Sequence, residues 1–374
     1  MKKILFQKLL LDYLKFAFIA LISASIVIWV FQAVNYLDIM IEDGRDYLVY
    51  LNFTILNFPK IISKILPFVL FFSIFYVTTR YEMSNELIIY WNFGVNKLQV
   101  VNYILKFSIL VMLLQIFLTS YVVPFTQDLA RSFLRSSTVN FYGNFIKPKK
   151  FNDTIKGVTI YSEKKDKNGI LYNLYLKKEI NENEFQITIA KSGEFKEISK
   201  TPVLVLYEGS TISAKNNEYS NITFSKSDFV LKNFETNATT YKKTQELSSQ
   251  ELFVCIKNYL KNKIFISKIE NCELANLSNI YKEFYKRFII PFYIPTLTII
   301  PFILIIISKE NSKYQKFRFA TFFIGFCVII FSEASIKLIN NILSKNLTFI
   351  IFPFFILAVI YMYLFFKFKT NMNQ

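Results

Sequence analysis

The sequence contains no histidine in its 374 residues. The chain therefore lacks the commonest general base, the Ser-His and Cys-His nucleophile pairs and the usual zinc ligand. Its eight glycines form no GxxxxGK[ST] loop, the sequence that cradles nucleotide phosphates. These absences exclude familiar hydrolase chemistry, and we expect a chain that is not an enzyme and does not itself hydrolyse ATP.

Cysteine is also scarce. The three cysteines form no CxxC pair, and Cys327 lies inside an apolar run. Cys255 and Cys272 could form one disulfide outside the cytoplasm, and the alternative is two unpaired thiols. The sequence leaves both states open.

Charged residues make up 19% of the chain, whereas hydrophobic residues make up 53% and aromatic residues 18%. This composition is too apolar for an ordinary soluble protein of this length. The formal charge of +17 would suit nucleic acid only if it formed a basic face on a soluble domain. Many of the cations instead flank apolar runs, so we expect a membrane protein with no nucleic-acid partner.

Six apolar stretches can cross a hydrocarbon layer of about 30 Å. Residues 1–15 form a lysine-bearing amphipathic pattern typical of an interfacial helix, not of a cleaved signal peptide. Pro59 divides the second stretch into an interfacial helix and a span, and Pro124 is expected to end the third span. The expected spans are residues 16–37, 61–79, 99–123, 288–308, 319–338 and 347–366.

The middle of the chain has a different texture. Between residues 125 and 282, short β-branched and aromatic segments alternate with Lys, Asn, Gly and Ser, a pattern typical of antiparallel strands in a sandwich or jelly roll. We predict an α-helical membrane protein with six transmembrane helices and an inserted all-β, jellyroll-like domain. The expected division is 1–124, 125–282 and 283–374.

Basic residues predict the orientation. Lysines precede the first span and follow the sixth, and further Lys and Arg residues lie in the loops between spans two and three and between spans four and five. By the positive-inside rule, both termini are cytoplasmic. The β-rich insert then faces outward, into the periplasm.

The segment between the second and third spans is the first candidate site. Residues 82–93 have a helical pattern in which Glu82 and Glu86 share one face, and Gly94 suits the left-handed residue that ends a helix. Such carboxylates could dock against an arginine of a cytoplasmic partner. The alternative is a solvated loop helix.

This segment also carries a resemblance to a known family. Glu86-Leu followed by Gly94-Val-x-Lys97 resembles the coupling-helix motif of the LptF/LptG permeases. The order of three spans, a β-domain and three more spans is similar as well. Residues 28–43, 157–161 and 166–171 resemble LptF more than LptG, whereas residues 88–93 are bulkier than usual in the family.

The resemblance implies a permease subunit of an ABC transporter in the bacterial inner membrane. In this family LptF pairs with a paralogous LptG-like permease above an LptB ATPase dimer, which uses the ATP. Lipopolysaccharide is extracted from the membrane and passed to the periplasmic jellyroll proteins LptC and LptA. By resemblance, Glu86 couples the permease to the ATPase, with Glu82, Arg80 and Gly94 as neighbours.

Cations expected on the outer side form a second candidate site. The positive-inside rule gives no reason for them there, and lipid A phosphates could bind them. The alternative is that their side chains extend to the headgroups, or that Lys337 pairs within its own helix. The candidates are Lys60, Lys64, Arg131, Arg135 and Lys337.

Apolar residues of the first and fifth spans are the third candidate. In the family these spans form lateral gates, so Val30, Val34, Phe322 and Phe326 are expected to line a cavity for acyl chains. The alternative is that they simply face lipid or neighbouring helices.

Two other functions fit parts of the sequence. An ABC-type mechanotransmitter permease also carries a large outer insert, although such proteins commonly have four spans. A membrane-anchored scaffold that binds a ligand without transport is a second possibility. The short cytoplasmic segments leave no room for a signalling domain, which argues against the scaffold.

Overall fold

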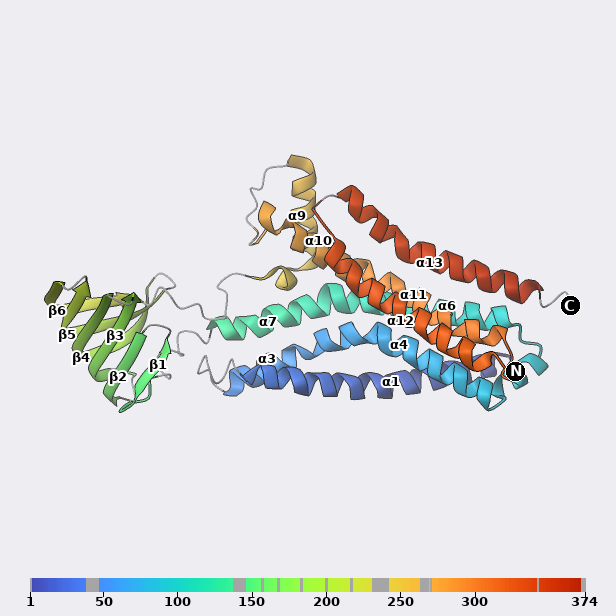
Figure 1. The fold of residues 1–374 in the computed structure, drawn as a ribbon, viewed down its shortest axis with the longest axis horizontal. Helices are drawn as coiled ribbons and strands as arrows, with labels where there is room; N and C mark the ends of the chain where they lie inside the picture. Colours follow the sequence, from blue (N-terminus) through green and yellow to red (C-terminus); the bar gives the residue numbers. More distant parts are fainter. Residues whose placement is uncertain are drawn as a thin grey trace. The chain divides into compact units, whose positions relative to one another are not determined.

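The computed structural model places the chain in two compact units (Figure 1). The helical unit comprises Met1–Phe31, Leu56–Asp128 and Tyr241–Gln374, and the strand-containing unit comprises Gln32–Ile55 and Leu129–Thr240. The structure describes residues 2–37, 47–136, 146–155, 158–166, 169–181, 184–198, 201–215, 218–230, 242–262, 269, 271–341 and 343–370.

Six helical segments among the described residues are long and apolar enough to cross a membrane. This confirms the predicted six-span architecture. The helices that form these segments are α1 (Lys2–Asn35), α3 (Tyr47–Leu56), α4 (Phe58–Met83), α6 (Lys97–Phe117), α7 (Val123–Ser136), α10 (Leu277–Phe288), α11 (Tyr293–Ile299), α12 (Tyr314–Leu338) and α13 (Leu343–Thr370).

The second apolar stretch divides close to the predicted place. Helix α3 ends at Leu56 and α4 begins at Phe58, so Asn57 forms the junction. Pro59 lies in the first turn of α4, where a missing backbone N–H costs no helical hydrogen bond.

Pro124 does not end the third span, contrary to the sequence-based expectation. Helix α6 continues through a π-helical turn, Leu118–Val122, into α7. Pro124 cannot donate to the carbonyl of Ser120, but the Ser249 hydroxyl donates to that oxygen at 2.5 Å. A side chain from a distant segment thus satisfies the carbonyl, and the helix persists.

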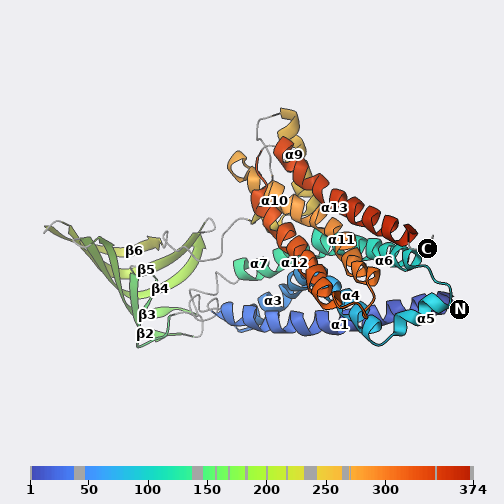
Figure 2. The same cartoon turned by 45° about the vertical axis from the view of Figure 1, so that its right-hand side comes forward.

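The fourth span lies at the centre of the helical unit. In its most apolar stretch, 78% of the residues are buried. The corresponding shares are 6% in the first span, 22% in the fifth and 11% in the sixth. Three prolines divide it into α10, the 3₁₀ turn Ile290–Phe292, α11 and the 3₁₀ helix Ile300–Ile306. Every residue of α11 is buried, and α11 contacts α4, α6 and α13 (Figure 2). The fifth span packs closely on α4, because a Cβ at Gly325 would lie 2.1 Å from the Phe71 ring.

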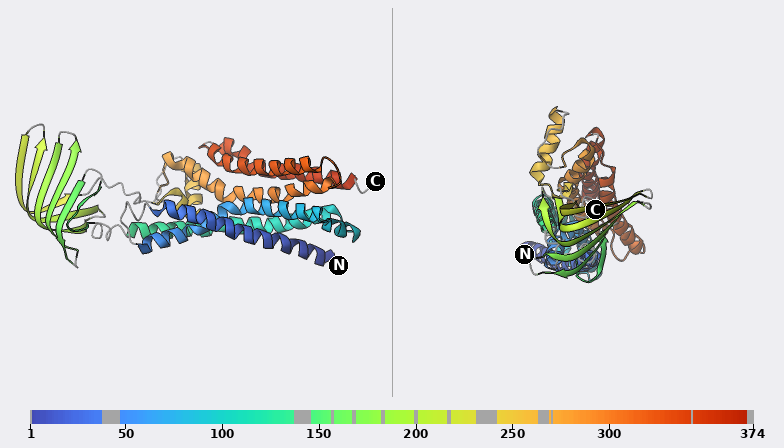
Figure 3. Two further views of the ribbon diagram at one scale, coloured as in Figure 1. Left: turned by 60° about the horizontal axis from the view of Figure 1, so that its bottom comes forward. Right: turned by 90° about the vertical axis from the view of Figure 1, so that its left-hand side faces the viewer.

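Six strands form one antiparallel sheet in the order β1 to β6. This confirms the inserted all-β domain, but the described strands form a single curved sheet instead of the two layers of a sandwich (Figure 3). The strands are β1 (Phe151–Ile155), β2 (Val158–Lys165), β3 (Leu171–Asn181), β4 (Glu184–Ile198), β5 (Thr201–Lys215) and β6 (Glu218–Val230).

The sheet buries one apolar cluster that includes Leu174, Leu176, Leu204 and Leu206. Gly209 of β5 is required by close packing of neighbouring strands, since a Cβ there would lie 2.2 Å from the carbonyl oxygen of Ile189. The sheet therefore has a core of its own.

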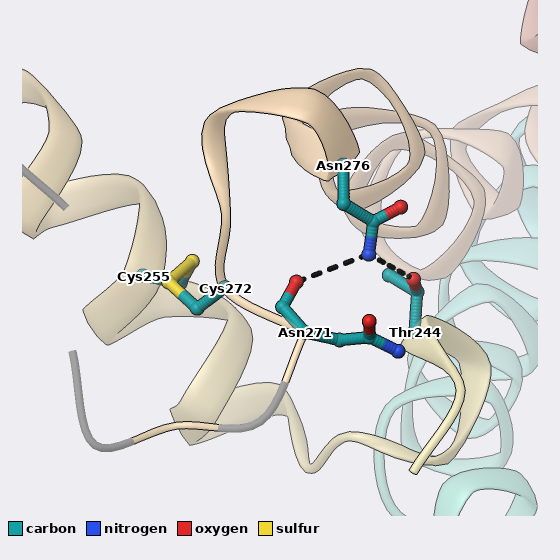
Figure 4. The surroundings of a disulfide bond; sticks show 5 residues. All are labelled: Thr244, Cys255, Asn271, Cys272 and Asn276. Carbon is teal, nitrogen blue, oxygen red and sulfur yellow. Dashed lines mark hydrogen bonds between the residues drawn. A yellow bond between two sulfur atoms is a disulfide. The ribbon is translucent and has the colours of Figure 1, made fainter. Parts of the chain in front are cut away.

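A disulfide joins Cys255 of α9 (Ser249–Asn262) to Cys272, with a Cα–Cα distance of 6.0 Å. Figure 4 shows the bridge, which is buried in a small apolar cluster. Both cysteines belong to the helical unit, in the region after the β-strands that the sequence predicted to be a connecting helix. Of the two states that the sequence left open, the structure has the bridge.

We predict that the bridge blocks two of the three thiols in the purified chain. A PEG-maleimide should add once without reductant, at the exposed Cys327, and three times after reduction in denaturant. Gel mobility counts the adducts, and the variant Cys327→Ser is the control that should give none before reduction. Three adducts before reduction would contradict the bridge.

Candidate functional site

A short helix, α5 (Glu86–Asn92), follows the second span at the end of the helical unit near the N-terminus (Figure 2). Two backbone features set its limits. Asn85 has a positive φ of 62° and separates α5 from α4. At the other end, Gly94 has φ 68°, and the N–H groups of Gly94 and Val95 donate to the carbonyls of Trp91 and Tyr90 at 2.9 and 3.0 Å. This is a Schellman motif, as the glycine predicted.

The predicted helix 82–93 is therefore wrong in its first half. Glu82 belongs to the last turn of α4, and α5 begins at Glu86. The N–H of Ser84 donates to the Arg80 carbonyl at 2.9 Å and ends α4 there. Glu82 and Glu86 consequently lie on two different helices and do not share one helical face.

Buried side chains fix α5 to the spans. Leu87 and Tyr90 are 2% and 3% exposed. The Tyr90 hydroxyl donates to the Leu5 carbonyl at 3.1 Å, and Tyr81 donates to Asp12 of α1. Burial raises the pKa of Tyr90 to about 12, so its phenol remains a neutral donor at physiological pH. Helix α5 is thereby attached to α1 and α4.

The opposite face of α5 is apolar and exposed. Ile88, Ile89 and Phe93 are each about half exposed. Glu86 lies beside them and accepts a hydrogen bond from Ser84 at 3.1 Å, while Arg80 is exposed. A partly anionic, apolar surface on a rigid helix is suited to binding another protein.

Two lysines attach α5 and α4 to the end of the fourth span. Lys97 donates to the carbonyl of Ile305 at 2.9 Å and lies 5.7 Å from the centroid of the Trp91 ring. Lys309 donates to the carbonyl of Met83 at 3.1 Å. A pocket of about 240 Å³ lies between these segments, and its lining includes Glu82, Lys97 and Lys309. Movement of α5 would therefore act on both the first and the fourth spans.

The structure places the predicted outer cations on three helices. Lys60 and Lys64 lie one turn apart on α4, and Lys60 donates to the side-chain oxygen of Gln245 at 3.4 Å. Lys337 is exposed in the last turn of α12. Arg131 is half-buried on α7 in the strand-containing unit, and the side chain of Arg135 lies outside the described residues.

The predicted apolar lining falls into two groups. Val30, Val34 and Phe326 are 50%, 57% and 40% exposed. Phe322 instead packs on α4, with its ring centroid 5.8 Å from that of Phe71 and 5.1 Å from that of Phe75. Val30 and Phe326 can line a surface of the helical unit, whereas Val34 belongs to the strand-containing unit. Phe322 joins two helices of the helical unit.

The sequence-based search missed Tyr90 and Lys309, and it placed Lys97 in the family motif without a contact partner. Lys97 also lies beside the start of a span, where the positive-inside rule alone would explain a cation. Nothing in the spacing shows that its amine reaches Ile305, a residue distant in the chain. Contacts between separate loops become visible only in the fold.

The fold and the site together define a class of protein: a multi-pass membrane protein with an inserted β-domain and a short helix that follows the second span. The sequence matches the family described as lipopolysaccharide export system permease LptF/LptG over residues 9–367, and the chain belongs to this family. It is therefore a multi-pass inner-membrane permease component for lipopolysaccharide export, not an enzyme.

A curated relative extends the comparison. The chain is 22% identical over 345 residues to the uncharacterized protein RP871 of Rickettsia prowazekii (strain Madrid E), and the match covers 90% of each chain. Similarity of this extent includes the spans and the strand insertion alike. The preference for LptF over LptG stays a prediction.

We predict that Gly94→Ala loosens α5. The left-handed conformation costs alanine roughly 1–2 kcal/mol, and the position is otherwise open, because the nearest atom to an added Cβ is the Lys2 amine at 4.0 Å. Amide hydrogen exchange of α5 should accelerate by about tenfold. Gly94→Asn is the matched control, since asparagine adopts this conformation more readily. Unchanged exchange in Gly94→Ala would contradict a structural need for this glycine.

Proposed function

We propose that the chain is the LptF-like subunit of an ABC transporter that extracts lipopolysaccharide from the inner membrane and passes it to a periplasmic bridge. An LptB-like ATPase dimer binds at α5, an LptG-like paralogue supplies the second half of the membrane unit, and LptC- and LptA-like jellyroll proteins receive the lipid. Both termini are cytoplasmic, and the β-sheet lies in the periplasm. The chain needs no cofactor of its own, because the ATPase uses the ATP.

The observation that carries this proposal is the construction of α5. Its exposed face holds Ile88, Ile89 and Phe93, while Leu87 and Tyr90 are buried against the spans. A helix held by buried side chains can transmit a displacement by a partner to the spans without detaching from them. Glu86 beside the apolar face offers a carboxylate to an arginine of the ATPase.

Hydrogen bonds indicate which spans a displacement of α5 would move. Tyr90 connects α5 to Leu5 of α1, and Lys97 connects its loop to Ile305 of the fourth span. Closure of the ATPase dimer would therefore move α5, α1 and the end of the fourth span as one body. The exposed sides of α1 and α12, which include Val30 and Phe326, would then narrow a cavity shared with the partner permease.

Basic residues support the second part of the proposal. Lys60, Lys64 and Lys337 lie near the ends of their helices, and Arg131 lies on α7 near the end of the third span. Phosphate groups of lipid A would bind such cations by charge-assisted hydrogen bonds. The substrate would be held by its charged head while its acyl chains occupy the apolar cavity.

We expect Glu86→Ala to lower ATP-driven lipopolysaccharide release from proteoliposomes by at least about tenfold, because a charge-assisted hydrogen bond of about 1.5–3 kcal/mol is lost. The thermal unfolding temperature of the purified chain should not change, since Glu86 is half-exposed and belongs to no core. Glu333→Ala on α12 is the control, because it removes an exposed carboxylate from a helix other than α5. Normal release and normal ATPase retention by Glu86→Ala would refute the coupling role.

We also expect the double variant Arg131→Gln/Arg135→Gln to weaken lipopolysaccharide binding several-fold. Photocrosslinking from a probe at α7 to lipopolysaccharide measures the change. The matched control is Lys147→Gln/Lys150→Gln, which removes two exposed charges from the same unit. Equal crosslinking in both double variants and the wild type would remove the arginines from the binding site.

A further inference from the structure

A second pocket lies at the opposite end of the helical unit from α5. It opens beside the start of the fourth span, whose other end reaches Ile305 near α5. Its volume is about 490 Å³, and it is broad and open. The lining residues are Lys243, Thr244, Gln245, Asn279, Lys282, Glu283, Lys286 and Ile336.

The charge of this pocket is positive. Three lysines line it, together with one carboxylate, that of Glu283. That carboxylate accepts a hydrogen bond from the buried Arg287 at 3.1 Å and lies 3.6 Å from the amine of Lys286. Arg287 is 1% exposed and is not part of the pocket lining. It therefore neutralises Glu283 from the buried side of that carboxylate. Lys243 and Lys282 therefore leave the cavity with a net positive charge.

The wall of the pocket is fixed in place. Arg287 donates to the carbonyls of Gln245 and Leu247 at 3.0 and 2.8 Å and to the Ser249 hydroxyl at 3.2 Å. These bonds hold the segment that carries Lys243 against α10, which carries Lys282. The lysine stems are thus presented from two elements that cannot separate without exposing a buried guanidinium.

Neutral donors complete the arrangement. The side-chain amide of Asn276 donates to the Thr244 hydroxyl oxygen at 3.0 Å, which leaves the hydroxyl hydrogen free to point elsewhere (Figure 4). Lys60 donates to the side-chain oxygen of Gln245, which orients the amide NH₂ group of that residue. The pocket therefore combines ammonium, hydroxyl and amide donors, a set that suits an anion with several oxygens.

We propose that this pocket binds a phosphoryl group. Lysines act as point charges for phosphate, and Thr244 and Asn279 can donate hydrogen bonds to the remaining oxygens. Ile336, from the last turns of the fifth span, adds an apolar wall at the level where a membrane helix ends. The same chemistry serves a phospholipid headgroup from the adjoining leaflet or a free phosphate ion.

The test uses the full-length purified chain in detergent, with phosphatidylglycerol and inorganic phosphate titrated in separate arms. Native mass spectrometry counts bound lipid, and calorimetry measures bound phosphate. In Lys243→Gln/Lys282→Gln the affinity should fall by about fivefold, as expected for two partly exposed charge pairs. Saturation by lipid alone assigns the site to a headgroup, and saturation by inorganic phosphate alone assigns it to the free ion.

A matched control separates this pocket from general attraction. Lys257→Gln/Lys345→Gln removes two exposed lysines from α9 and α13, outside the pocket lining. Its affinity should equal that of the wild type, and equal weakening in both double variants would overturn the proposal, as would binding of neither ligand. The assay contains no ATPase and no lipopolysaccharide, so its result is independent of the coupling role of α5. Unchanged unfolding temperatures verify that both double variants remain folded.

Discussion

Burial of the fourth span is the constraint on which the rest of the helical unit depends. Its prolines leave carbonyls without helical donors, and in a membrane no water can replace them. Packing by α4, α6 and α13 encloses α11 completely, and the hydroxyl of Thr119 donates to the carbonyl of Arg287, four residues before Pro291, at 2.9 Å. A span that breaks its own hydrogen-bond ladder can exist only at the centre of such a bundle.

The central span also connects the two sites. At one end, Ile305 accepts the hydrogen bond from Lys97 beside α5. At the other end, Arg287 holds the segment that lines the basic pocket, and the carbonyl of Arg287 accepts a hydrogen bond from Thr119 in the π-helical region of α6. Movement of α5 would therefore act on a rigid element that extends to the basic pocket.

The outer helices have the opposite character. Only 6% and 11% of the residues in the most apolar stretches of α1 and α13 are buried, and the exposed residues are largely apolar. In a membrane these faces require lipid or another protein. This asymmetry between a buried central span and exposed flanking spans fits a chain that forms half of a larger membrane unit. Val30 of α1 and Phe326 of α12 are among the exposed apolar residues.

The sequence by itself determined the spans, the strand-rich insertion and the glycine that ends α5, because these follow from local hydrophobicity, β-propensity and backbone conformation. The tertiary structure decided what depends on distant partners. Ser249 allows the third span to continue past Pro124, Cys255 meets Cys272, and Arg287 assembles a pocket from separate segments. The break at Asn85 has the same origin, since the burial of Tyr90 against α1 sets the position of α5. Local patterns specify which residues enter the membrane, and only packing specifies which polar groups meet.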